Sequence, residues 1–101
     1  MDRKQKGKIP ESGDLPDISR DPLAVGAKQL KKAVRAGKAA RVYLAENADP
    51  ALTQPLAELC GEYQIQITWV ADMADLGRAC GIEVGAAAAA VLKILPENSV
   101  E

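Results

Sequence analysis

Residues 27–45 have the sequence AKQLKKAVRAGKAARVYLA, in which a helical pattern is followed closely by the pattern of a strand. On a helix over residues 27–36, at about 100° per residue, the basic side chains fall on one side and the larger apolar side chains on the other. Gly37 follows as a helix stop. Residues 41–45 are mostly apolar, as in a short buried strand. The stretch therefore predicts a helix that packs its apolar side inward and exposes its basic side, followed by a strand.

The charge of the chain is unevenly distributed. Its formal net charge is only −1, which argues against indiscriminate binding to nucleic acid. Between Gly26 and Ala45 there are six bases and no acid, whereas from Glu46 onward acids outnumber bases nine to two. A domain with this distribution would present one cationic face to an anionic partner, while the rest of its surface would repel non-specific contacts. The six bases are Lys28, Lys31, Lys32, Arg35, Lys38 and Arg41.

Two further helices and a strand are predicted after this stretch. Thr53 is the expected N-cap of a helix, because it would place Pro55 in the first turn, where a missing N–H is harmless. Residues 65–70 are rich in β-branched side chains and indicate a strand. The next helix is expected to start from an Asp72 cap and to stop before Gly81. Strand and helix therefore alternate, as in an α/β domain.

Residues 85–95 contain five successive alanines, and local rules leave their structure open. Alanine has the highest helix propensity, yet it also suits a central strand that helices approach closely. Without this segment the sheet would have only three candidate strands, over residues 23–25, 41–45 and 65–70. We therefore expect residues 85–95 to form a fourth strand.

The length of 101 residues suits one compact domain. We expect residues 1–22 to form a flexible polar arm, residues 23–95 to form the α/β domain and residues 96–101 to form a short tail. The arm carries several early bases, so a weak contact with RNA stays open beside the simpler interpretation of a solvated arm.

The composition argues against an enzyme. The absence of histidine removes the usual general base near neutral pH and every nucleophile pair that depends on it. We find no glycine-rich phosphate loop and no pair of acids spaced as a tuned catalytic pair. Cys60 and Cys80 cannot complete a four-ligand zinc site, and we expect both to be reduced and buried. The sequence therefore predicts a protein without catalytic activity, metal or cofactor.

Two other classes of protein are also disfavoured. No apolar run approaches the roughly 20 residues that span a bilayer, and the first residues lack the apolar stretch of a signal peptide. We therefore expect a cytoplasmic monomer without membrane contact. The chain has no phenylalanine, and its three aromatic residues lie where strands or helices need core, so no aromatic platform for single-stranded RNA is expected. These residues are Tyr43, Tyr63 and Trp69.

Two linked motifs carry a resemblance to a known family. They are GAKQLKKAVRAGKAARVYLAENADP, at residues 26–50, and LGRACGIEVGAA, at residues 76–87. Together they resemble the L7Ae and L30e type of ribosomal protein that recognises kink-turns in RNA, and the chain is most similar to the small bacterial members. The resemblance implies a three-layer α-β-α sandwich around a four-stranded mixed sheet. It also implies that RNA is bound by the N-terminus of the basic helix and by the loop before the last strand.

The resemblance assigns roles to residues of the basic helix. A polar pair at its start reads the guanines of sheared G·A pairs in the family, and the matching positions are Lys28 and Gln29. Many members have Asn-Glu there, so the affinity and the choice of RNA are left open by this departure. Lys32 is placed for a phosphate, and the backbone N–H groups of Gly26 and Ala27 add to the anion-attracting helix end. Weaker candidates for RNA contact are Lys31, Arg35 and Lys38.

The second motif supplies the other part of the implied site. Ile82 and Val84 match apolar family positions that cover an extruded nucleotide of the bulge, and Glu83 lies between them. Without the motifs, the lysines would be interpreted as a solvated helix face, and the two apolar residues could instead begin a strand.

The leading hypothesis is recognition of kink-turns, with their sheared G·A pairs and bulge, in ribosomal RNA or a structured leader RNA. The alternative is a protein-protein adaptor, or a ribosome-associated accessory protein, with the same fold and weak RNA affinity.

Overall fold

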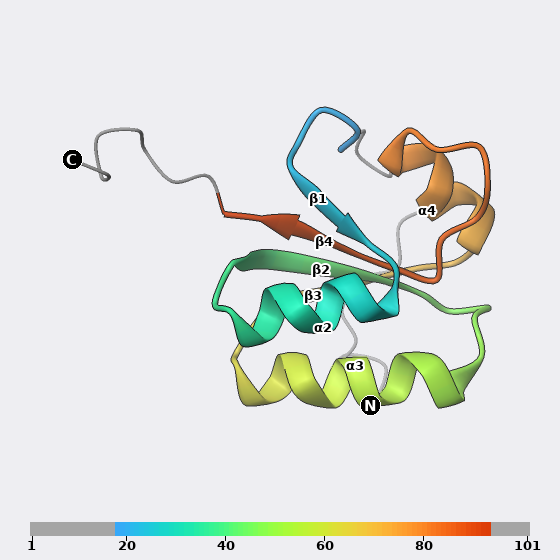
Figure 1. Ribbon diagram of the computed structural model, residues 1–101. Coiled ribbons are helices and arrows are strands. Elements are labelled where there is room, and N and C mark those ends of the chain that lie inside the picture. Colours follow the sequence, from blue (N-terminus) through green and yellow to red (C-terminus); the bar gives the residue numbers. More distant parts are fainter. Residues whose placement is uncertain (1–17, 94–101) are drawn as a thin grey trace.

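A computed structural model of the chain describes residues 18–93. The predicted arm before residue 18 and the predicted tail at residues 96–101 lie outside this range. The described part forms a three-layer α-β-α sandwich, in which helices cover both sides of the sheet (Figure 1). The elements are β1 (Leu23–Val25), α2 (Ala27–Arg35), β2 (Ala39–Ala45), α3 (Pro50–Glu62), β3 (Ile67–Val70), α4 (Met73–Cys80) and β4 (Ala88–Leu92).

The sheet is mixed and has the strand order β1-β4-β2-β3. Strands β2 and β3 are parallel, whereas β4 is antiparallel to both of its neighbours. The predicted four-stranded mixed sheet is therefore confirmed, and so is the strand within residues 85–95. Local propensity alone favoured a helix there. Pairing on both edges of β4 decides the conformation, because a central strand gains a backbone partner on each side.

The alanines of β4 suit its place between two helical layers. Ala88 and Ala90 are fully buried on the side of α2 and α3. Ala89, also fully buried, lies on the opposite side, in the cluster that includes Leu76 of α4. Successive strand residues point to opposite faces, so β4 contributes to both cores. Small side chains let the helices on both sides approach the sheet closely.

The folded region begins before the boundary predicted at Leu23. The side chain of Ile18 is only 2% exposed and belongs to the core on the α4 side. Its N–H also donates to the carbonyl of Ala79 at 3.0 Å. The end of the expected arm is thus part of the packed domain, because Ile18 packs against α4.

The start of α3 also differs from the prediction. Its N-cap is Asp49, whose Oδ1 accepts the N–H of Ala51 at 2.9 Å, and Pro50 occupies the first helical position. Thr53 is a buried residue of the first turn, not the cap. Pro55 consequently lies inside the helix, where it supplies no N–H to the backbone ladder.

The aromatic residues are less buried than the sequence suggested. Tyr43 is buried, but Trp69 is only partly buried and Tyr63 is 45% exposed. Tyr63 follows the last residue of α3 as its C-cap, so it leaves the apolar face of the helix. The prediction of three core aromatic residues was therefore correct for Tyr43 and partly correct for Trp69, which packs against the core on the side of α2 and α3, and it was wrong for Tyr63.

Both cysteines are buried and free, as expected. Burial disfavours the thiolate, which raises the pKa of Cys60 to about 11 and also raises the pKa of Cys80. Residues 18–93 include no helix that is long and apolar enough to cross a membrane. The same residues hold no group of three or more side chains suited to binding a metal ion.

Enlarging Ala90 tests the close packing of β4 against α2 and α3. We expect Ala90→Leu to lower the free energy of unfolding by about 1–3 kcal/mol, because the added atoms have no space in a filled core. Ala40→Leu, at an exposed position of β2, is the control and should change it by less than about 0.5 kcal/mol. Urea denaturation measures the free energy of unfolding of both variants. Equal effects of the two substitutions would contradict the close packing.

Candidate nucleic-acid interface

The start of α2 and the loop before β4 meet at one edge of the sheet. Strands β1 and β4 are antiparallel, with Val25 opposite Ala89. The N–H of Gly26, which precedes α2, donates to the carbonyl of Ala88 at 2.9 Å. Figure 1 shows the segment before β4 descending to the point where β1 passes into α2. The two segments that the family resemblance assigned to RNA are therefore adjacent.

The N-terminus of α2 carries no side-chain cap and no acidic residue in its first turn. Its N-cap is Gly26, at φ 103° and ψ 155°, a backbone conformation that is essentially restricted to glycine. In contrast, Asp49 caps α3 and Asp72 caps α4. The first N–H groups of a helix have no partner within the helix. At α2 they are available to an anion, which the helix dipole also favours.

The polar side of α2 is exposed and cationic, as predicted. Leu30, Ala33 and Val34 pack against the sheet and α3, so the other side faces solvent. Within residues 18–93, no ion pair engages the cations of this helix. The exposed predicted site residues of α2 are Lys28, Gln29, Lys31, Lys32 and Arg35, and Lys38 is exposed in the turn that follows the helix.

The exposed side chains of α2, together with Lys38, border two hollows on the surface. The first is shallow and lies on the helix itself, between Lys28, Lys31 and Arg35. The second lies between α2 and β1 and is lined by Gln29 and Lys38 among others. Lys32 borders both hollows. The basic side is thus a continuous surface that extends from the start of α2 toward the free edge of the sheet.

Arg41 does not belong to this surface. Its Nε donates to the hydroxyl of Tyr43 at 3.3 Å, and this hydrogen bond is the main cause that raises the pKa of Arg41. Tyr43 packs in the core on the α4 side, whereas α2 covers the other side of the sheet. Arg41 is therefore turned away from the other five bases of residues 26–45.

The apolar pair of the loop is divided by the fold. Val84 is 69% exposed, whereas Ile82 is partly buried against the core on the α4 side. Both residues lie in the loop before β4 and neither begins a strand. Glu83, between them, is exposed. Val84 thus presents most of its side chain to solvent, and Ile82 anchors the loop to the domain.

Gly77 of α4 determines how closely this loop can lie. An added Cβ at Gly77 would be 2.0 Å from the carbonyl oxygen of Val84, which is far inside van der Waals contact. The loop is also hydrogen-bonded to α4 on both sides of this contact, from Ile82 N–H to Gly77 O and from Ala86 N–H to Met73 O, each at 3.0 Å. Sequence reasoning missed Gly77. A glycine within a helical pattern was the available signal.

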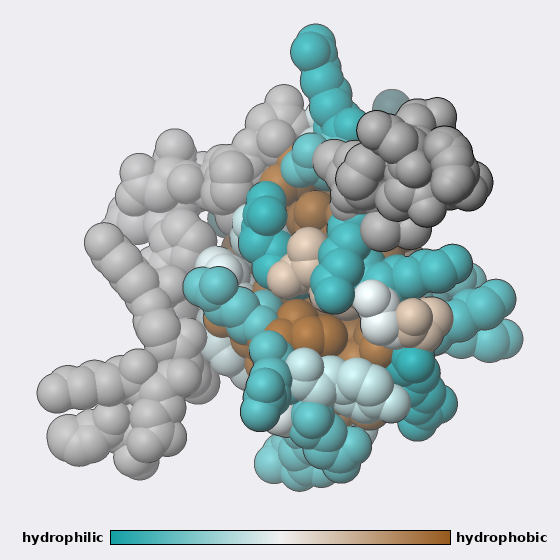
Figure 2. Space-filling view, turned by 90° about the vertical axis from the view of Figure 1, so that its left-hand side faces the viewer, coloured by the Kyte–Doolittle hydropathy of each residue, from teal (hydrophilic) through white to brown (hydrophobic). Residues whose placement is uncertain are grey.

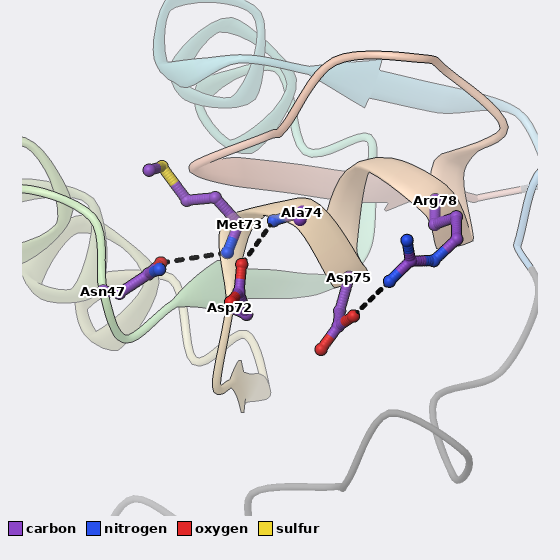
Figure 3. Close-up of polar contacts among 6 residues, drawn as sticks. All are labelled: Asn47, Asp72, Met73, Ala74, Asp75 and Arg78. Atoms are coloured by element: carbon purple, nitrogen blue, oxygen red, sulfur yellow. Dashed lines mark hydrogen bonds and ion pairs between the residues drawn. The ribbon is translucent and has the colours of Figure 1, made fainter.

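The N-terminus of α4 is fixed by two side chains (Figure 3). Oδ1 of Asp72 accepts the N–H of Ala74 at 2.7 Å, and Oδ1 of Asn47 accepts the N–H of Met73 at 2.9 Å. Asn47 comes from the turn after β2, so this turn is tied to the helix that carries the loop. This role of Asn47 could not be predicted from local sequence, because its partner is 26 residues away.

Arg78 is the one base of α4. Its guanidinium pairs with Asp75 one turn earlier, with Nη2 and Oδ1 2.5 Å apart (Figure 3). The Arg78 side chain is 72% exposed, so this pair contributes little to stability.

Comparison with known proteins places the chain in a family. Residues 17–98 match the model of the ribosomal protein L7Ae/L30e/S12e/Gadd45 family, and the chain belongs to this family. A protein of Caldanaerobacter subterraneus subsp. tengcongensis named as RNA-binding is 48% identical over 66 residues, which is 65% of this chain and 80% of that protein. The large ribosomal subunit protein eL8 of Halobacterium salinarum is 38% identical over 79 residues, which is 75% of this chain and 66% of eL8.

Solved structures share the fold. The 15.5kD RNA-binding protein of Giardia lamblia superposes with a TM-score of 0.68 at 29% identity, over 77% of this chain and 66% of that one. A Bacillus halodurans protein described as having unknown function superposes with a TM-score of 0.65 at 32% identity, over 70% of this chain and 71% of that one. The predicted family and fold are both confirmed.

Replacing Gly77 tests whether α4 positions the loop. We expect Gly77→Ala to lower the free energy of unfolding by about 1–3 kcal/mol, because the new Cβ must displace the backbone at Val84. The control is Gly61→Ala in α3, where a Cβ would meet nothing within 4 Å. Gly61→Ala should raise the free energy of unfolding by up to about 1 kcal/mol, because alanine has the higher helix propensity. Denaturant unfolding measures the free energy of unfolding of both variants. A gain of stability in Gly77→Ala would contradict the close contact between α4 and the loop.

Proposed function

We propose that this protein binds RNA at kink-turns, in ribosomal RNA or in a structured leader RNA. The observation that carries the proposal is the junction of Gly26 with Ala88, where an uncapped basic helix and a loop with an exposed apolar side chain lie together. The names of the relatives, several of which are RNA-binding proteins, support the general class of ligand. The geometry supports recognition of kink-turns in particular, because kink-turns offer a site of matching shape.

A kink-turn bends two helical stems around a short bulge next to sheared G·A pairs. Regular A-form RNA keeps its major groove too deep and narrow for side chains to read. The bend opens this groove and exposes guanine edges, so that the end of a protein helix can enter. The bulge also extrudes a base, which needs an apolar surface beside the groove. The proposed ligand therefore has two features that match the two parts of the interface.

The start of α2 would read the guanines. The ammonium of Lys28 can donate to O6 or N7 of guanine, and the amide of Gln29 can both donate and accept at a base edge. Lys32, one turn further along the exposed side, is placed for a phosphate. The N–H of Ala27 would add to an anion site at the helix end. The N–H of Gly26, which the sequence also assigned to this site, is not available, because it donates to the carbonyl of Ala88.

The remaining cations would extend the contact along the RNA backbone. Lys31, Arg35 and Lys38 are exposed and lie further along α2 or in the turn after it. Phosphate contacts of this kind fix the orientation of a protein on RNA but carry no sequence information. Specificity would therefore depend on the first turn of α2.

The loop would receive the extruded base. Val84 offers an exposed apolar surface, and Ile82 supports the loop from the core side. Stacking on such a surface contributes up to about 1–3 kcal/mol per base, and less on aliphatic groups than on aromatic ones. Glu83 would disfavour a phosphate at the same place. The loop is therefore suited to a base and not to the RNA backbone.

The charges elsewhere would restrict RNA to this face. Residues 46–83 contain seven acids and a single base, Arg78, which is paired with Asp75. A surface of this charge repels phosphate. The small negative net charge is therefore compatible with RNA binding that is confined to α2 and the adjacent loop.

A salt titration tests binding through the basic helix. Contact with about three to five phosphates predicts that the logarithm of the affinity falls against the logarithm of the salt concentration with a slope of about −2 to −4. The titration uses an RNA duplex that contains a kink-turn and records its affinity by fluorescence anisotropy. A chain that acted only as a protein-protein adaptor would show little salt-dependent RNA binding, and this outcome would contradict the proposal.

Matched RNA and protein changes test the recognition of sheared pairs. We expect Lys28→Ala to weaken binding to a kink-turn by about 1–3 kcal/mol, because a contact to guanine is lost. On an RNA whose G·A pairs are replaced by Watson-Crick pairs, the same substitution should cost much less. Lys93→Ala removes the same charge from the opposite end of the sheet and serves as the control. Equal losses for Lys28→Ala on both RNAs would identify Lys28 as a phosphate contact without a role in specificity.

A further inference from the structure

A groove runs along the β1 edge of the sheet, between α2 and β1. It has a volume of about 470 Å³, with an apolar floor that includes Ala33 and Leu92. Three consecutive residues of β1, Leu23–Val25, line it. Since side chains alternate between the two faces of a strand, a groove that contacts all three must follow the strand's edge. Strand β1 pairs only with β4 in the described sheet, so its other edge is open to an additional chain segment.

The rim of this groove is polar and cationic. Gln29, Lys32 and Lys38 lie along it, and no acidic side chain is among its lining residues. An occupant of the groove should therefore combine apolar side chains with negative charge. All three rim residues also belong to the proposed RNA-binding surface. Any segment that occupied the groove would consequently cover part of that surface.

The chain itself leaves the sheet at the mouth of the groove. Leu92, the last residue of β4, lines the groove, and the N–H of Lys93 donates to the carbonyl of Lys38 at 2.7 Å. Figure 2 looks toward this end of the domain and shows hydrophobic side chains surrounded by hydrophilic ones. The residues that follow, 94–101, have the sequence ILPENSVE. They contain three large apolar residues and two glutamates, and neither lysine nor arginine.

The 94–101 segment is long enough to reach the groove. Its eight residues can span at most about 26–29 Å when extended. Passing from β4 across β1 to the open edge requires about two strand spacings, or about 10 Å. The remaining length covers the three residues of β1, and Pro96 is compatible with a turn on the way. Length, apolar content and charge therefore all match the groove.

We propose that the 94–101 segment folds back into the groove, with Glu97 or Glu101 beside Lys32 and Lys38, and that it competes there with RNA. The competition rests on the proposed function, whereas the docking does not. RNA binding would require the segment to leave the groove. A segment that is docked in about four of five molecules weakens the apparent RNA affinity about fivefold.

Zero-length crosslinking of the full chain tests the docking without RNA. A carbodiimide joins a carboxylate to an amine only when the two are in contact. We expect peptides that link Glu97 or Glu101 to Lys32, found by mass spectrometry of the monomer band. A mixture of ¹⁴N-labelled and ¹⁵N-labelled chains separates links within one chain from links between copies. Links only between copies, or links that reach neither Lys32 nor Lys38, would overturn the proposal.

A pair of double substitutions tests the competition. We expect Glu97→Gln with Glu101→Gln to tighten binding to a kink-turn RNA by up to about fivefold, because the docked segment is released. The control, Glu58→Gln with Glu62→Gln, removes the same charge from exposed positions of α3 that do not line the groove. An equal gain in both variants would overturn the competition. If no variant binds RNA, the proposed function fails, and the crosslinks still decide whether the segment docks.

Discussion

The hydrogen bond between Gly26 N–H and Ala88 O holds together the two halves of the proposed interface. It forms because β1 and β4 run antiparallel, so that the end of one strand lies beside the start of the other. The helix that follows β1 and the loop that precedes β4 must then lie side by side. Gly26 also takes a backbone conformation reserved for glycine, which directs the chain from the strand into α2. The charge of α2 and the shape of the loop matter for a ligand only because this junction brings them together.

Much of the fold could be predicted because its signals are local. The basic helix, strand β2 and the Asp72 cap of α4 follow from periodicity and capping within a few residues. The strand of alanines could not be settled in this way, since two neighbouring strands decide its conformation. The start of α3 was misplaced because Asp49 and Thr53 are both good N-caps, and local rules did not rank them. Ile18 was missed because its partner, α4, is some 60 residues away in the sequence.

The candidate site was predictable in a similar, partial way. The exposure of Lys28 and its neighbours on α2 follows from the helical period of the apolar residues. The different burial of Ile82 and Val84 does not, because it depends on how the loop lies against α4. The close approach that a glycine permits at position 77 is a tertiary contact, which the sequence marks only by placing glycine within a helix. The hydrogen bond from the turn after β2 to α4 likewise connects residues distant in the chain.

If the helix end and the loop act as one binding surface, RNA must affect both at once. Amide ¹H–¹⁵N spectra of the protein, recorded during titration with a kink-turn RNA, test this coupling. We expect the signals of residues 26–29 and of residues 82–85 to change together, at the same RNA concentrations, while those of α3 change little. Changes along α2 without any change in the loop would contradict it, because they would show a cation-lined helix that attracts RNA without a second point of contact.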